Sequence, residues 1–236
     1  MCKMLYRYRY RVEGCFVRTC NRFLADNRRS KLNNTDFSII SNNCWGGSVY
    51  RHYGIPYLSP TVGLYIWPTD YVKFCSNLKS YMSKSLEFIP YTESKYREEL
   101  EHKKEGHVPI ARLGDDVEIV FLHYKTQEEA AEKWYRRASR INYNNLIFKF
   151  SKLDSCSYEN LKAFDLLDCR KKFCFLPTVD VAKVKSGIPF KRTKTNKKGD
   201  IEVCHETLGY ARSINLNKMI NSKIVCGVRM EGTYLE

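Results

Sequence analysis

The chain has 236 residues, of which 43% are hydrophobic and 14% aromatic, so it can bury a core of ordinary size and is not a disordered protein. It has no run of about 18 apolar residues, which argues against a membrane-spanning helix, and we expect a cytoplasmic protein without a signal peptide. Ten cysteines are scattered without any C-x-x-C pair, so the sequence predicts no disulfide framework, no metal and no cofactor.

The net charge of +14 is unevenly distributed. Residues 1–35 hold nine Lys or Arg against two Asp or Glu, residues 36–150 hold fifteen against fourteen, and residues 151–236 hold sixteen against ten. The near-neutral centre argues against a nucleic-acid-binding protein, which would carry its basic stripe on the folded domain. We therefore predict a basic amphipathic segment over 1–35 and a single α/β domain over 36–236, best defined over 36–150.

The basic segment alternates tyrosine and arginine from Tyr6 to Arg11 and then places apolar residues at helical spacing. Arginine combined with aromatic residues suits the headgroup region of an anionic membrane, and docking at the inner face of the membrane is one interpretation. A basic surface helix packed on its own domain is the other.

Strand-like and helix-like stretches alternate along the domain, and two turns contain candidate chemistry. Cys44 lies between the first strand and a helix that ends at Gly54, and His123 follows the clearest strand. Because a strand, a helix and a second strand form a βαβ unit, we predict a central mixed or mostly parallel sheet flanked by helices. Cys44 and His123 would then lie at carboxyl ends of strands, where α/β proteins bind ligands. The predicted elements are strands 37–41, 62–66, 117–122, 145–150 and 172–176, helices 46–53, 70–81, 127–141 and 158–164, a charged helix or mobile insertion over 93–105, and a basic loop over 186–200 with a turn at 196–200.

The turn Ser41-Asn-Asn-Cys-Trp-Gly-Gly47 is the first candidate site. Asparagine and glycine pack poorly in a core but allow a ligand to approach the backbone closely. A buried structural cysteine is the alternative. The candidate binding residues of this turn are Asn42, Asn43, Trp45, Gly46 and Gly47, together with Cys44 as a possible catalytic group.

The helix after the capping box Thr126–Glu129 is the second candidate site. Lys133, Arg136, Arg137 and Arg140 are three or four residues apart and share one helix face. Guanidinium groups match the geometry of phosphate, so Arg136, Arg137 and Arg140 are candidate phosphate ligands. Ion pairs with acidic side chains, or solvent, are the alternative.

Several of these motifs, in the same order, resemble bacterial exopolysaccharide and capsule biosynthesis proteins that are catalogued as a domain of unknown function. The similarity is strongest over about residues 30–150. It implies a role in assembling or decorating surface polysaccharide, and it assigns no reaction to any residue. The motifs that carry it are S-N-N-C-W-G-G at 41–47, S-P-T-V-G-L-Y at 59–65, D-Y-V-K-F at 70–74, F-L-H-Y-K-T-Q-E-E-A at 121–130 and the basic residues up to Asn142.

A weaker similarity is to an uncharacterised bacterial family regarded as papain-like. It implies Cys44 as a nucleophile at a helix N-terminus, His123 as its base, Asn142 as the residue that orients the histidine, and Asn42 or Asn43 at an oxyanion. The chain departs from papain-like enzymes because His123 leads into a helix and no glutamine precedes the cysteine.

Three hypotheses follow. The first is a transferase in which the arginine face holds the phosphate of a nucleotide-sugar, lipid-phosphate or acyl donor and His123 acts as general base on a glycan acceptor. The second is a Cys44–His123 hydrolase or acyltransferase. The third is a non-catalytic assembly protein that docks on the membrane through residues 1–35. We favour the first.

Overall fold

The structure is a computed structural model that describes residues 23–103, 105–154, 156–204, 206 and 214–226. The Tyr–Arg alternation at residues 6–11 lies outside this part of the chain. Of the predicted basic segment, residues 23–29 are described as helical.

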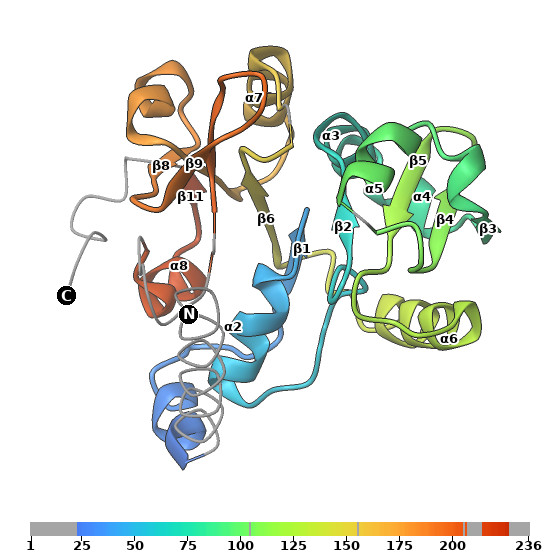
Figure 1. Ribbon diagram of the computed structural model, residues 1–236. Coiled ribbons are helices and arrows are strands. Elements are labelled where there is room, and N and C mark those ends of the chain that lie inside the picture. Colours follow the sequence, from blue (N-terminus) through green and yellow to red (C-terminus); the bar gives the residue numbers. More distant parts are fainter. Residues whose placement is uncertain (1–22, 104, 155, 205, 207–213, 227–236) are drawn as a thin grey trace, which may run out of the picture.

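The described part of the chain forms two larger sheets and a two-stranded hairpin, and Figure 1 shows the two larger sheets side by side. The main sheet is parallel, and a smaller antiparallel sheet packs beside it, so the predicted α/β class with a mostly parallel central sheet is confirmed. The main sheet has the order β1 (Ser38–Ser41), β6 (Leu146–Ser151), β7 (Lys171–Leu176) and β11 (Val225–Cys226), with β8 (Gly187–Pro189) also pairing with β7. The second sheet has the order β2 (Tyr65–Ile66), β5 (Val117–Val120), β4 (Ile110–Leu113) and β3 (Leu86–Ile89), and a separate hairpin joins β9 (Thr193–Thr195) to β10 (Ile201–Val203).

Helices surround both sheets; in Figure 1, α2 lies below β1 and α6 lies below the second sheet. None of the helices in the described part of the chain is both long enough and apolar enough to cross a membrane. The helices are α2 (Trp45–Tyr53), α3 (Pro68–Ser76), α4 (Leu78–Met82), α5 (Arg97–Lys103), α6 (Gln127–Ala138), α7 (Tyr158–Asp165) and α8 (Leu216–Asn221), with 3-10 turns at Tyr91–Glu93 and Thr178–Lys183.

Successive side chains of the central strand β6 belong to two different parts of the hydrophobic core. Successive strand residues point to opposite faces of a sheet. Ile147 therefore packs with Trp45 and Phe173 on the face that α2 covers, whereas Phe148 packs with the second sheet and Trp134 of α6. The core between the two sheets joins them into one packed unit.

The predicted βαβ units are wrong. The strand before His123 is β5, which lies in the antiparallel sheet, whereas the strand after α6 is β6, in the main sheet. Likewise β1 and β2 lie in different sheets. The parallel neighbours β1 and β6 are separated in the sequence by the whole second sheet, and local patterns do not reveal which distant strand will be the partner.

Several element boundaries also differ from the prediction: the strand expected over 62–66 is only β2, and the helix expected over 127–141 ends at Ala138. Asp70 lies inside the first turn of α3, which has Trp67 as N-cap, and the helix is interrupted at Asn77. Of the two alternatives for the charged block over 93–105, the helix is present as α5, which also buries Leu100. The basic loop contains β8 and β9, although its predicted turn is present, because the Asn196 N–H bonds the Asp200 carbonyl.

Candidate functional site

The turn after β1 joins the two sheets at the carboxyl edge of the main sheet. The backbone of Asn42 donates to the Lys149 carbonyl of β6 and accepts from the Ile66 N–H of β2. The two glycines that follow allow α2 to pack closely, since a Cβ on Gly46 would lie 3.1 Å from Ile39 Cγ2 and a Cβ on Gly47 only 2.8 Å from Val62 Cγ1. The glycines therefore serve the packing of α2.

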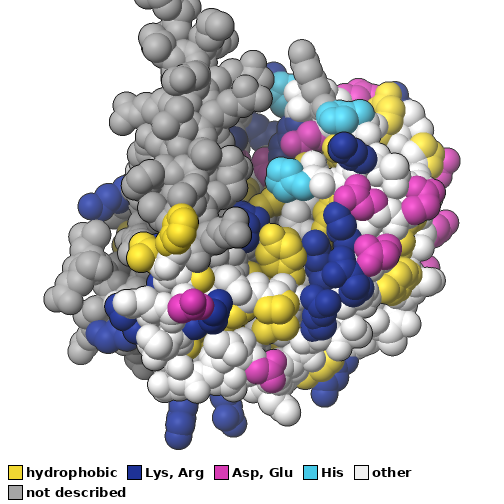
Figure 2. Space-filling view, turned by 90° about the horizontal axis from the view of Figure 1, so that it is seen from below, with side chains coloured by type: hydrophobic (Ala, Val, Ile, Leu, Met, Phe, Trp, Pro, Cys, Tyr) yellow, Lys and Arg dark blue, Asp and Glu magenta, His cyan; other side chains and the backbone are white. Residues whose placement is uncertain are grey.

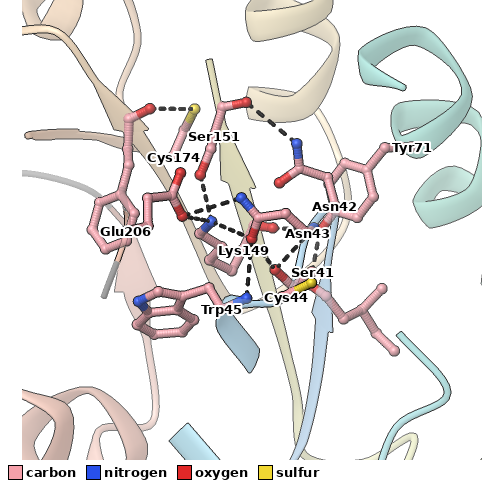
Figure 3. A network of polar contacts seen from close by, with 12 residues as sticks. Ser41, Asn42, Asn43, Cys44, Trp45, Tyr71, Lys149, Ser151, Cys174 and Glu206 are labelled. Carbon is pink, nitrogen blue, oxygen red and sulfur yellow. Dashed lines mark hydrogen bonds and ion pairs between the residues drawn. The ribbon is translucent and has the colours of Figure 1, made fainter. Parts of the chain in front are cut away.

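A buried lysine lies directly beside this turn, as Figure 3 shows. The Lys149 side chain is fully buried and its Nζ donates to Asn43 Oδ1 at 3.0 Å, to the Ser151 hydroxyl and to the Glu206 carboxylate. Burial lowers the pKa of Lys149, and the Glu206 carboxylate partly opposes this shift. The result is a charged pair held inside the sheet beside the buried polar side chains of Ser41 and Ser151.

Cys44 is the N-cap residue of α2 and is half-buried. Its thiol donates to the Leu64 carbonyl at 3.7 Å. Burial raises the pKa of Cys44 to about 11, and Arg51 and Lys149 offset only part of this effect. A thiol with such a pKa is almost entirely protonated at neutral pH, so the surroundings of Cys44 do not activate it as a nucleophile.

His123 and Asn142 do not assemble with Cys44 into a triad. The His123 backbone N–H bonds the Gly63 carbonyl at 3.0 Å and its side chain is exposed; no hydrogen bond joins it to Cys44 among the described residues. Asn142 donates to Asp36 at 2.8 Å and its N–H bonds the Ser38 hydroxyl, at the amino end of β1. Cys44 follows the opposite end of that strand, so Asn142 lies at the wrong edge of the sheet to orient a base for Cys44.

Two cations on the basic face of α6 form ion pairs with carboxylates, and a third is buried. Lys133 pairs with Glu129 at 2.5 Å and Arg136 with Glu132 at 2.6 Å. Arg137 is buried, donates to the Val62 carbonyl at 3.2 Å and stacks over the Tyr57 ring at 4.8 Å. Arg137, a predicted phosphate ligand, thus binds the loop before β2 instead. Its guanidinium group is hydrogen-bonded to the Val62 carbonyl and stacked on the Tyr57 ring.

Arg136 and Arg140 line a cavity of about 620 Å³ together with two arginines that the sequence did not single out. Arg51 donates to the Ser48 and Tyr57 hydroxyls, and Arg140 donates weakly to the Tyr57 carbonyl at 3.4 Å. Neither has a carboxylate partner among the described residues. The lining of this arginine cavity is Ala25, Asp26, Arg29, Arg51, Gly54, Ile55, Pro56, Tyr57, Arg136 and Arg140.

The charge balance of the arginine cavity favours an anionic ligand. Of its four guanidinium groups, that of Arg29 pairs with Asp26 and that of Arg136 with Glu132, which leaves Arg51 and Arg140 without a carboxylate partner among the described residues. Figure 2 shows Lys and Arg side chains gathered beside hydrophobic ones on the lower face of the molecule. Arginine forks bind phosphate in two-pronged hydrogen bonds, and the apolar part of the lining could contact an attached group.

One of the residues that the sequence analysis missed has a weak signal in the sequence. Lys149 interrupts an apolar strand, Leu146-Ile-Phe-Lys-Phe150, at a position that must be buried if both faces of the strand are covered. Arg51 lies on a predicted helix but has no basic neighbour at helical spacing. Glu206 has no local pattern at all, because its role depends on a contact with β6.

The fold and these two features define an α/β protein with a buried lysine–glutamate pair at the carboxyl edge of a parallel sheet and a basic cavity beside the amino end of β1. The chain belongs to the family described as a domain of unknown function (DUF1919), whose model matches residues 17–221. It is also similar to an uncharacterised protein of Haemophilus influenzae, with 31% identity over 153 residues that cover 65% of this chain and 68% of the relative.

Proposed function

We propose that this protein is a transferase of bacterial surface polysaccharide biosynthesis that binds a phosphate-bearing donor in the arginine cavity and passes the attached group to a glycan acceptor. The observation that carries the proposal is the cavity itself, in which Arg51 and Arg140 have no carboxylate partner among the described residues. The polysaccharide setting rests on the motif resemblance described above.

The alternative of a cysteine hydrolase has less support. It needs a thiolate at neutral pH and a histidine and asparagine beside it, whereas the Cys44 pKa is raised to about 11 and Asn142 lies at the other edge of the sheet. A transferase of the proposed kind needs no thiolate.

Titration of the protein with inorganic pyrophosphate tests the donor site. We expect saturable binding that weakens with added salt. Arg51→Ala and Arg140→Ala should each weaken it by about tenfold or more, because a charge-assisted hydrogen bond contributes roughly 1.5–3 kcal/mol. Isothermal titration calorimetry gives the affinities directly.

Lys133→Ala is the matched control, since Lys133 is also a cation of α6 but pairs with Glu129 and does not line the cavity. We expect its pyrophosphate affinity to equal that of the unaltered chain. Absence of saturable binding, or an equal loss in Lys133→Ala, would show that the cavity is not a phosphate site.

At the cellular level, deletion of the gene should lower surface polysaccharide, and Arg51→Ala should fail to restore it.

A further inference from the structure

The arginine cavity combines cationic surface with apolar surface. Its guanidinium groups lie beside four apolar or aromatic side chains, those of Ala25, Ile55, Pro56 and Tyr57. None of the described residues that line it has an amide or an aliphatic hydroxyl group. A ligand that fills this cavity therefore meets cations and hydrocarbon, and few neutral polar groups.

The hydrogen-bond acceptors of the lining are largely occupied by its own arginines. The Asp26 carboxylate pairs with Arg29, and the Gly54 carbonyl accepts from Arg29 at 3.1 Å. The hydroxyl and the carbonyl of Tyr57 also accept from arginines of the lining, at 3.3 Å and 3.4 Å. A nucleoside would bring sugar hydroxyls and base amino groups that need acceptors, and burying such donors unpaired is unfavourable. The lining suits a phosphate with an apolar attached group better than it suits a nucleotide.

The helix that contains Asp26 and Arg29 connects the cavity with two exposed apolar side chains. Ala25, Asp26 and Arg29 line the cavity and, at helical spacing, share one side of this helix. Phe23 and Leu24 point away from that side and are exposed. Because a helix with its side chains is about 10–12 Å thick, a membrane that takes up Phe23 and Leu24 would lie within about that distance of the cavity.

We propose that the donor bound in the arginine cavity is lipid-linked, a phosphate or diphosphate whose apolar chain lies against Ile55, Pro56 and Tyr57 and is anchored in the membrane. This rests on the proposed function and chooses among the donors that it leaves open. The guanidinium groups hold the phosphate oxygens, and the hydrocarbon covers the apolar part of the lining. A nucleotide-linked donor is the competing outcome of the test.

Three diphosphates that differ in the attached group test the lipid-linked donor. The full-length chain would be titrated with inorganic pyrophosphate, uridine diphosphate and farnesyl diphosphate by isothermal titration calorimetry. The last two are both monoesters of diphosphate, so their difference reports the attached group. We expect farnesyl diphosphate to bind about tenfold tighter than pyrophosphate or more, since burying roughly 60 Å² of apolar surface corresponds to about tenfold in affinity. Uridine diphosphate should bind no more than about twofold tighter than pyrophosphate.

Two variants locate the farnesyl group within the cavity. Ile55→Ala removes apolar lining and no charge, so it should weaken farnesyl diphosphate by about threefold or more and leave pyrophosphate within about twofold. The pyrophosphate titration also shows that this variant is folded. Arg51→Ala should weaken both ligands. Leu166→Ala is the matched control, because Leu166 is an exposed apolar residue that does not line the cavity, and it should change neither affinity.

The outcomes separate this inference from the proposed function. Farnesyl diphosphate that binds no tighter than pyrophosphate, or less tightly than uridine diphosphate, overturns the lipid-linked donor while the phosphate site stands. The same holds if the affinity for farnesyl diphosphate is unchanged in Ile55→Ala or in Arg51→Ala, since its chain would then bind elsewhere. Absence of pyrophosphate binding overturns the proposed function and this inference with it.

Discussion

At the scale of single residues, Cys44 shows that position in the chain and chemical surroundings can point in opposite directions. It caps the amino end of α2, a place where a helix lowers a thiol pKa. Its Sγ nevertheless bonds the Leu64 carbonyl at 3.7 Å, and the effect of burial on its pKa outweighs that of the nearby cations. The thiol is a packed neighbour of the carboxyl edge, which the residue type alone could not reveal.

Slow alkylation of Cys44 is the direct consequence. With a pKa of about 11, roughly one molecule in a thousand carries the thiolate at about pH 8, against roughly a quarter for a free cysteine. We expect iodoacetamide to modify Cys44 at least a hundredfold more slowly than a free peptide with the sequence of residues 41–47. The rate should rise about tenfold per pH unit up to about pH 10. Mass spectrometry of the Cys44 peptide follows it, and a rate equal to that of the free peptide would refute the inactive thiol.

Some single residues were recognisable from the sequence and others were not. Helical spacing places Arg136 and Arg140 on one helix face, so the sequence alone predicts that these two cations need an anion nearby. Arg137 lies between them but is buried against Tyr57. Its burial depends on the loop at Val62, which is seventy-five residues away in the chain. Such long-range contacts leave no periodic trace.

At the scale of elements, the predictions that depend only on residues close together in the sequence are confirmed. The helix ending at Gly54 is present, with Gly54 in the left-handed conformation at φ 61°, and α7 and β7 lie where predicted. In the capping box, Thr126 accepts from the Glu129 N–H, but the Glu129 carboxylate bonds the Lys125 N–H. Sheet membership was not predicted, because β2 to β5 form a second sheet inserted between two parallel neighbours.

The packing of α2 against the loop before β2 leads to a prediction about Gly47. An added methyl group would meet the stiff β-branched side chain of Val62. The backbone carbonyl of Val62 accepts hydrogen bonds from Arg137 and Tyr124, which hold this residue in place. We expect Gly47→Ala to lower the free energy of unfolding by about 1–3 kcal/mol, although alanine favours a helix by about 1 kcal/mol. Urea denaturation measures the change.

The neighbouring substitution Ser48→Ala is the control for the α2 packing. Ser48 is half-buried on the same helix, and among the described residues its hydroxyl bonds Arg51, so the change should stay within about 0.5 kcal/mol. A gain in stability for Gly47→Ala would mean that α2 and the loop are not in close contact at this position.

At the scale of the whole molecule, charge and exposed apolar groups meet on the side of the arginine cavity. The helix over residues 23–29 contributes Ala25, Asp26 and Arg29 to the cavity, and Arg29 fastens it to the end of α2 through the Tyr53 and Gly54 carbonyls. The same helix exposes Phe23 by 79% and Leu24 by 47%. A chain of net charge +14 with such a helix suits an anionic membrane surface, as the basic N-terminal segment suggested.

We therefore predict that the full-length chain sediments with vesicles of phosphatidylcholine and phosphatidylglycerol in equal parts, and not with phosphatidylcholine alone. Burying an apolar side chain in the membrane contributes roughly 1.5–3 kcal/mol, so Phe23→Ala/Leu24→Ala should weaken binding by about tenfold or more. Leu166→Ala is the matched control, because Leu166 is 85% exposed at the end of α7, away from the cavity. An equal loss with Leu166→Ala would indicate nonspecific adhesion, whereas loss confined to the helix would place the arginine cavity at the headgroup layer, where a lipid-linked phosphate donor is supplied.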